Sequence, residues 1–201
     1  MSLRQAQRRT AAPLRYGRLL RALRSEISHE LSSSPPPLQS QAGISVGDFV
    51  VDWDDARAQD VLLRRRAGPE EEEEVAVSGL LGPLRFDGED PAPREALVKV
   101  VVKKAGLDPA LHFHCRVFDG GFSVGSARYH SSVADLGPDK YRGPSFSTLD
   151  PLLQNALKGY LAERGINEQL TAFLLQHLCQ KEDGQYLNWL RTVEGFVTKG
   201  S

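Results

Sequence analysis

Apolar residues are spaced differently at the two ends and in the middle of this 201-residue chain. Between Val46 and about His130, short apolar runs alternate with polar residues and are separated by Gly, Pro and Asp, as is typical of antiparallel strands. Before and after this region, apolar residues recur every three or four positions, as along one side of a helix. The sequence therefore predicts an α+β fold, with an antiparallel sheet between helices at both ends.

The first helix is expected over residues 16–32. Its apolar stripe consists of Leu20, Leu23, Ile27 and Leu31, at spacings of three and four. Three consecutive prolines at 35–37 remove backbone donors and prevent the helix from continuing. Residues 33–44 are therefore expected to form a linker, followed by a sheet over 45–147, with residues 16–201 making a single domain.

Within the sheet region, alternating side chains indicate which face of each strand is buried. Phe49, Val51 and Trp53 are predicted to share one face of the first strand. The next strands are expected at 61–65, 75–81 and 97–104. The segments 111–118 and 122–130 flank Asp119-Gly120-Gly121, whose glycines supply the positive φ angles of a tight turn, so they are predicted to form a hairpin.

The last fifty residues are expected to be helical over 150–198. Asp150 can cap a first helix with Pro151 at its first position, and Gly165 is placed to end it. Asn167 can cap a second helix. A third helix is expected to carry the apolar residues between Tyr186 and Val197.

Charges are sorted along the chain rather than mixed. Residues 1–24 contain seven arginines and no acidic residue. The rest of the chain therefore has 18 basic and 26 acidic residues, and its net charge is about −8. An arginine-rich start without acids is typical of an organellar transit peptide, and residues 1–15 are interpreted in this way. The same composition is compatible with a basic arm or with the first turns of a native helix.

Residues that could support catalysis are few. His112 and His114 project from the same face of a strand and could share a metal ion, but no motif supplies the third ligand of a catalytic zinc site. Cys115 and Cys179 form neither a CxxC pair nor a zinc cluster and are expected to behave as small apolar residues. No catalytic residue, metal site or cofactor is predicted.

The C-terminal block resembles that of the mitochondrial acidic matrix protein family, which includes a complement-receptor-like, hyaluronan-binding matrix protein. The resemblance extends back to the Gly47–Val51 strand and the first helix, and the stretches 83–88 and 141–146 suggest a plant or algal branch. The matching segments are 149–154, 160–161, 164–166, 181–182, 186–187, 189–190 and 196–197.

The resemblance implies a twisted seven-stranded antiparallel sheet, one N-terminal helix and C-terminal helices, assembled as a ring-shaped homotrimer in the mitochondrial matrix. It also implies a non-enzymatic adaptor or chaperone for basic proteins, such as ribosomal proteins or assembly factors, that supports mitochondrial translation, ribosome assembly or oxidative phosphorylation. The family's long acidic loops are shorter here, which makes binding of polycations less assured.

Two sets of residues are candidates for these interactions. The acidic residues expected to bind basic partners are Glu70, Glu71, Glu72, Glu73, Glu74, Asp87, Glu89 and Asp90. The residues expected in oligomer or helix packing are Leu20, Leu23, Ile27, Leu157, Tyr160, Leu161, Tyr186, Leu190, Val193 and Phe196. The alternatives are a metal-dependent enzyme using His112 and His114, and an RNA-binding protein using the N-terminal arginines.

Overall fold

The fold was analysed in a computed structural model, which describes residues 16–33, 43–65, 72–119, 121–132, 141 and 143–199. The expected transit peptide at 1–15 and most of the expected linker at 33–44 lie outside these residues. The chain divides into two compact units. One contains helix α1 (Gly17–Ser33) and helix α3 (Glu168–Lys199) from Gln180 onward; the other contains every described strand, helix α2 (Pro151–Ala162) and the start of α3.

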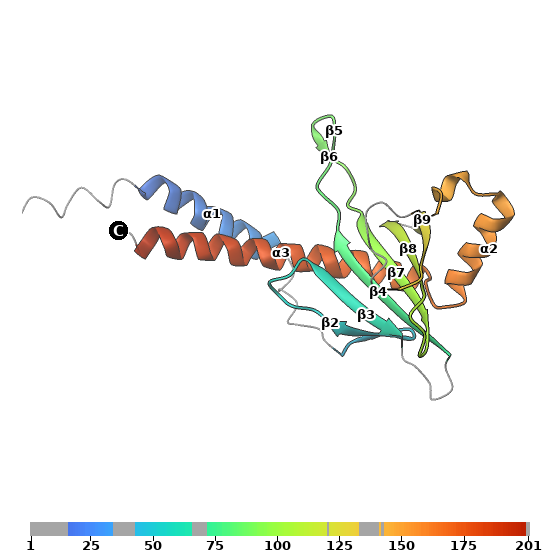
Figure 1. The fold of residues 1–201 in the computed structure, drawn as a ribbon. Helices are drawn as coiled ribbons and strands as arrows, with labels where there is room; N and C mark the ends of the chain where they lie inside the picture. Colours follow the sequence, from blue (N-terminus) through green and yellow to red (C-terminus); the bar gives the residue numbers. More distant parts are fainter. Residues whose placement is uncertain are drawn as a thin grey trace, which may run out of the picture. The chain divides into compact units, whose positions relative to one another are not determined.

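The larger unit is built on a seven-stranded antiparallel sheet with strand order β1-β2-β3-β4-β7-β8-β9 (Figure 1). A separate two-stranded hairpin, β5–β6, interrupts the sequence between β4 and β7. The fold class, the strand number and the single N-terminal helix predicted from the sequence and its resemblance are confirmed. The strands span Ser45–Val46 (β1), Phe49–Trp53 (β2), Asp60–Arg65 (β3), Glu73–Leu81 (β4), Phe86–Asp87 (β5), Asp90–Pro91 (β6), Ala96–Lys104 (β7), Ala110–Phe118 (β8) and Gly121–His130 (β9).

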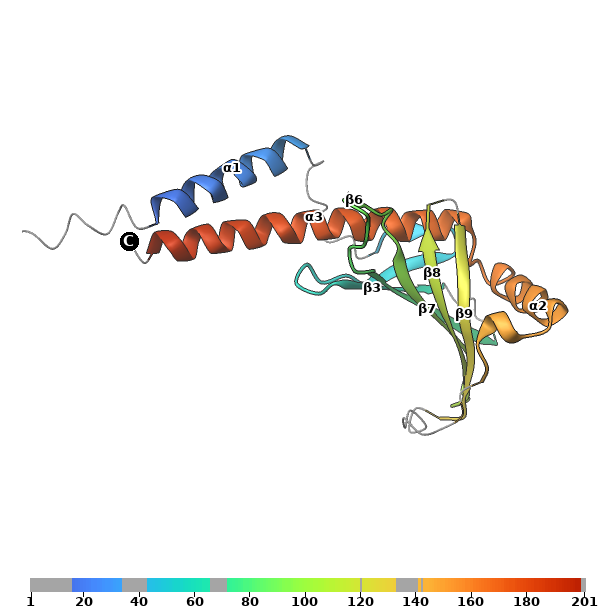
Figure 2. The ribbon, with the colours of Figure 1, turned by 90° about the horizontal axis from the view of Figure 1, so that it is seen from above.

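One face of the sheet is buried and the other is not. Val98, Val100 and Val102 of β7 are at most 5% exposed, whereas the intervening residues are partly exposed, as the alternation predicted. Helix α2 and the beginning of α3 contribute Leu161, Leu170, Leu174 and Leu178 to the same apolar core. The hydrophobic face of the sheet is therefore covered by helices from the C-terminal part of the same unit (Figure 2).

The first long strand departs from the predicted alternation. Phe49 and Val51 are 1% exposed, but Trp53 is 42% exposed. The pairing register of β2 with β3 shifts between Val51 and Trp53, so one extra residue turns the side chains that follow away from the core. The prediction that Trp53 shares the buried face is wrong for this reason.

The hairpin of β8 and β9 forms where the sequence predicted it, with Phe118 paired to Gly121. Gly121 itself does not have a positive φ, and Gly120 lies outside the described residues. Beyond β9, an isolated bridge joins Ser126 to Ser145, and a short 3-10 helix, η2 (Phe146–Thr148), precedes α2.

The capping residues of the C-terminal helices act as predicted. The Asp150 side chain accepts a hydrogen bond from the Leu152 backbone N–H at 2.9 Å, and Asn167 caps α3 in the same manner through the Leu170 N–H at 3.0 Å. Gly165, between the two helices, has a φ of 83°, a conformation that glycine adopts without strain.

The expected second and third C-terminal helices are one continuous helix, α3, of 32 residues. The segment between them contains no proline, and its only glycine, Gly184, costs about 1 kcal/mol inside a helix, which is too little to break it. The prediction of two helices here is therefore wrong, and the C-terminal part of the chain contains two helices, α2 and α3, in the described residues.

The smaller unit is a pair of helical segments, α1 and the end of α3, with its own apolar cluster. Leu23, Leu190 and Val197 are buried, with Leu20, Ile27 and Val193 packed against them. Leu31, predicted on the same stripe, is 53% exposed because it lies in the last turn of α1. None of the described helices is both long and apolar enough to cross a lipid bilayer.

Candidate functional site

The β5–β6 hairpin projects beyond the ends of β4 and β7 (Figure 1). Its two strands are joined by Gly88 and Glu89, and Gly88 has a φ of 68°, as required at the first central position of a type II′ turn. The Gly82 N–H donates to the Glu95 carbonyl at 2.7 Å, and Arg85 pairs with the Glu95 carboxylate at 2.8 Å. The hairpin is therefore fixed at its base and free of packing at its tip.

The tip of this hairpin concentrates negative charge. Asp87, Glu89 and Asp90 are all exposed, and none forms an ion pair with another described residue. Leu84 and Phe86, just before them, are 50% and 62% exposed. The sequence had singled out the three acids, and the structure shows that they share one tip with two exposed apolar side chains.

The acidic run at residues 70–74, whose last two residues begin β4, lies in a different environment. Glu73 accepts two hydrogen bonds from Arg164, at 2.9 Å and 3.1 Å, and both side chains are largely buried. The Arg164 guanidinium also lies over the Tyr160 ring, 3.3 Å from its centroid. Glu73 therefore joins β4 to the turn that follows α2. Glu72 and Glu74 are exposed, and Glu70 and Glu71 lie outside the described residues.

A second buried acid, Asp54, is not among the candidates identified from the sequence. The Asp54 carboxylate lies 3.1 Å from His177 Nε2, with side chains 7% and 2% exposed. His177 also stacks on Phe173, with ring centroids 5.4 Å apart. The neighbouring acids form separate ion pairs, Asp52 with Arg64 at 2.7 Å and Asp55 with Arg57 at 3.5 Å.

His112 and His114 lie on the same face of β8, as predicted, and this face is opposite to the one that buries Phe113 and Cys115. The His112 ring contacts that of His130 with centroids 4.2 Å apart, and His114 is paired in register with Lys99 of β7. Burial first, and then the charges of His130, Lys99 and His114, lower the pKa of His112 to about 4. Burial and the nearby Arg128 likewise lower the pKa of His114.

The charged neighbours of these histidines are the cations Lys99 and Arg128. In the part of the chain that the structure describes, no three His, Cys, Asp or Glu side chains come together as a metal site. Cys115, on the buried face of the same strand, is a free thiol whose pKa is raised by burial to about 12, which keeps it protonated and unreactive.

The residues predicted for helix packing divide between the two units. Leu157, Tyr160 and Leu161 pack in the core of the sheet unit. Tyr186, in the smaller unit, donates to the Glu26 carboxylate at 3.0 Å and stacks on Trp189. Trp189 and Phe196, seven residues apart on α3, are 57% and 79% exposed, so they line a free apolar stripe of that helix.

Comparison with known proteins gives a consistent assignment. The model of the MAM33 family, described as mitochondrial glycoprotein, matches residues 52–197. The mitochondrial acidic protein mam33 of Schizosaccharomyces pombe is 32% identical over 138 residues, which cover 64% of this chain and 51% of that protein. An uncharacterized mitochondrial protein of Arabidopsis thaliana is 31% identical over 103 residues, covering 50% of this chain and 40% of that protein. The chain thus spans about half the length of the curated relatives it matches.

Two solved structures share the fold. The Trypanosoma brucei p22 protein superposes with a TM-score of 0.68 at 23% identity, covering 90% of this chain and 97% of that one. A Leishmania major protein of unknown function, described as a sequence homologue of human p32, gives a TM-score of 0.67 at 21% identity and covers 90% and 98%.

Proposed function

Because this chain belongs to the MAM33 mitochondrial glycoprotein family, we propose that it is a non-enzymatic scaffold or chaperone-like adaptor that binds basic partner proteins. Family membership makes it a mitochondrial protein, and the matrix is the usual compartment of the family. The partners we propose are basic proteins such as ribosomal proteins or assembly factors, in support of mitochondrial translation, ribosome assembly or oxidative phosphorylation.

The observation that carries this proposal is the tip of the β5–β6 hairpin. Asp87, Glu89 and Asp90 present three carboxylates without internal counter-ions, and the exposed Phe86 and Leu84 add apolar surface beside them. Unpaired carboxylates accelerate encounter with cationic segments, and buried apolar anchors add the affinity that charge alone does not provide. A segment with both basic and apolar residues fits this tip.

A binding experiment tests the proposal. Fluorescence anisotropy would follow a labelled peptide rich in Lys, Arg and Leu as the full chain is added, at about 0.05 M and about 0.5 M salt. We expect binding that weakens at high salt, and a loss of at least about tenfold when Asp87→Asn, Glu89→Gln and Asp90→Asn are combined. The changes remove charge but preserve the shape of the hairpin.

A control with the same change in net charge separates the hairpin from the protein's overall field. Asp108→Asn, Asp119→Asn and Glu163→Gln remove three exposed acids that lie outside the hairpin. We expect this control to change affinity by less than about twofold. Equal losses in the two triple variants would contradict the role of the hairpin.

The proposal includes self-association into a homotrimer, supported by the exposed aromatic stripe of Trp189 and Phe196 on α3. Sedimentation equilibrium of the full chain is expected to give three times the chain mass of 22.2 kDa. Replacing both aromatics by serine should lower the mass, whereas replacing Phe118, an exposed aromatic of the sheet unit, should not. A chain that stays monomeric at every concentration contradicts this part.

No specific contact supports the two alternative functions, a metal-dependent enzyme and an RNA-binding protein. His112 and His114 lie beside cations that disfavour metal binding, and RNA binding by the first arginines concerns residues outside the described part of the chain. Arg18, Arg21 and Arg24 belong to α1, where Arg24 pairs with Glu194 at 2.7 Å.

A further inference from the structure

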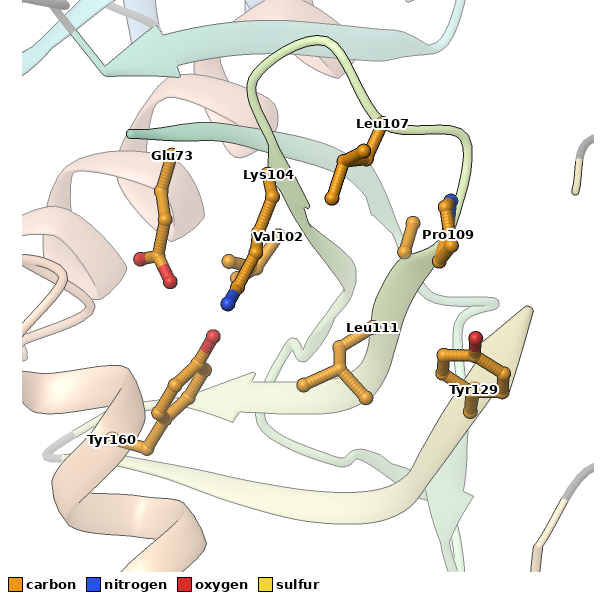
Figure 3. Close-up of a pocket in the computed structure, with 9 residues that line it drawn as sticks. Glu73, Val102, Lys104, Leu107, Pro109, Leu111, Tyr129 and Tyr160 are labelled. Carbon is orange, nitrogen blue, oxygen red and sulfur yellow. The ribbon is translucent and has the colours of Figure 1, made fainter. Parts of the chain in front are cut away.

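A small apolar pocket of about 240 Å³ opens at the end of the sheet, between β7, β8, β9 and α2 (Figure 3). Its floor is formed by Val102, which is 4% exposed, and by Leu111. Leu107 and Tyr129 lie at the rim and are 51% and 61% exposed. One water molecule occupies about 30 Å³ in the liquid, so the volume of this pocket corresponds to roughly eight groups of that size.

One wall of the pocket is held rigidly. Tyr160 of α2 is covered by the Arg164 guanidinium, which is itself fixed by its two hydrogen bonds to Glu73. Burial raises the pKa of Tyr160, so its hydroxyl remains a hydrogen-bond donor at neutral pH. The wall is therefore organised before any ligand arrives, which lowers the cost of binding.

The polar end of the pocket is formed by Glu73, Lys104 and Tyr160. Glu73 lines it, but its charge is matched by Arg164. Lys104 forms no ion pair with a described residue, and its ammonium group points toward the Tyr160 hydroxyl (Figure 3). The Lys104 ammonium and the Tyr160 hydroxyl thus offer two donors, one of them charged, beside a Glu73 carboxylate whose charge is matched by Arg164.

We infer that this pocket binds a small carboxylic acid with an aliphatic or aryl body of roughly eight heavy atoms. The carboxylate lies between the Lys104 ammonium and the Tyr160 hydroxyl, and the hydrocarbon body contacts Val102, Leu107 and Leu111. This site is independent of the acidic hairpin and of the proposed binding of basic proteins.

Three linear ligands with the same number of carbon atoms test the inference on the full-length protein. Octanoate, 1-octanol and octylamine are titrated while NMR follows the methyl groups of Val102, Leu107 and Leu111. We expect octanoate to bind with a dissociation constant near or below about 1 mM, followed by the alcohol and then the amine. Methyl shifts confined to this pocket locate the site.

Two neighbouring lysines provide a matched pair of variants. Lys104→Met keeps the apolar stem and removes the charge at the pocket, whereas Lys103→Met makes the same change on the opposite face of β7. We expect Lys104→Met to weaken octanoate about fivefold and leave octanol unchanged, and Lys103→Met to leave both unchanged.

The inference is overturned by any of three results. These are the absence of methyl shifts in this pocket with octanoate, equal binding of octanoate and octylamine, or equal effects of the two lysine substitutions. Tyr160→Phe provides a further check, since it preserves the ring under Arg164 and should weaken octanoate but not octanol.

Discussion

The acidic residues of the sheet and those of the β5–β6 hairpin have similar chemistry but opposite environments. Glu73 and Asp54 are buried against Arg164 and His177, whereas Asp87, Glu89 and Asp90 are exposed and form no ion pair with a described residue. A count of acids therefore overstates the charge available to a partner. The contrast supports a structural role for the first group and the proposed binding of partners for the second.

The largest effect is expected from removing the most deeply buried acid. Asp54→Ala leaves His177 buried without this partner and should lower the free energy of unfolding by about 3 kcal/mol. Urea denaturation at neutral pH measures the change. Asp48→Ala, an exposed acid just before β2, is the control and should stay within about 0.5 kcal/mol. A similar change in the free energy of unfolding for both variants would contradict the distinction between buried and exposed acids.

A somewhat smaller loss of stability is expected when the partly buried ion pair between Glu73 and Arg164 is broken. Glu73→Gln breaks the two-bond contact with Arg164, whose side chain is 15% exposed, and should cost about 2 kcal/mol. The exposed neighbour Glu72→Gln serves as control in the same denaturation series. A cost for Glu73→Gln no greater than that of the control would show that the contact is not structural.

His112, on the uncovered face of the sheet, should make the stability of the protein depend on pH. Because the folded-state pKa of His112 is about 4, below its ordinary 6.5, the unfolded chain binds more protons between these values. The contribution of His112 should therefore lower stability as the pH falls from about 6.5 to about 4. The fall should be smaller for His112→Gln, and NMR titration of the His112 ring should give its pKa directly. A ring that titrates near 6.5 would contradict the described environment.

The smallest effect on stability is expected at the hairpin itself. The combined changes Asp87→Asn, Glu89→Gln and Asp90→Asn remove no described contact and should alter the free energy of unfolding by no more than about 0.5 kcal/mol. Thermal and urea unfolding check this value. A large loss would mean that the three acids stabilise the fold, and a loss of binding by the variant would then have no specific meaning.

The parts of the fold that local patterns specify were predictable from the sequence. The alternation in β7, the caps Asp150 and Asn167 and the β8–β9 hairpin each depend on residues close together in the chain. Trp53 was misplaced because a bulge depends on the partner strand. The continuity of α3 was missed because a polar stretch with one glycine resembles the end of a helix, although it does not prevent the helix from continuing.

The candidate sites were less predictable, because their contacts join residues far apart in the sequence. Glu73 meets Arg164 across 91 positions, and Asp54 meets His177 across 123. No local pattern distinguishes Glu73 from Glu72, or Asp54 from Asp52. The sequence identified the acids of the hairpin by composition, but it could not show that Leu84 and Phe86 are exposed beside them.

The most direct test of this account is to map the binding surface residue by residue. In a 1H–15N NMR titration with the basic, leucine-containing peptide, we expect the largest backbone shifts in residues 84–91. Asp54, Glu73 and their neighbours should remain unchanged. Shifts centred on the buried acids Asp54 and Glu73, or spread evenly over all exposed acids, would contradict the claim that the hairpin is the binding element.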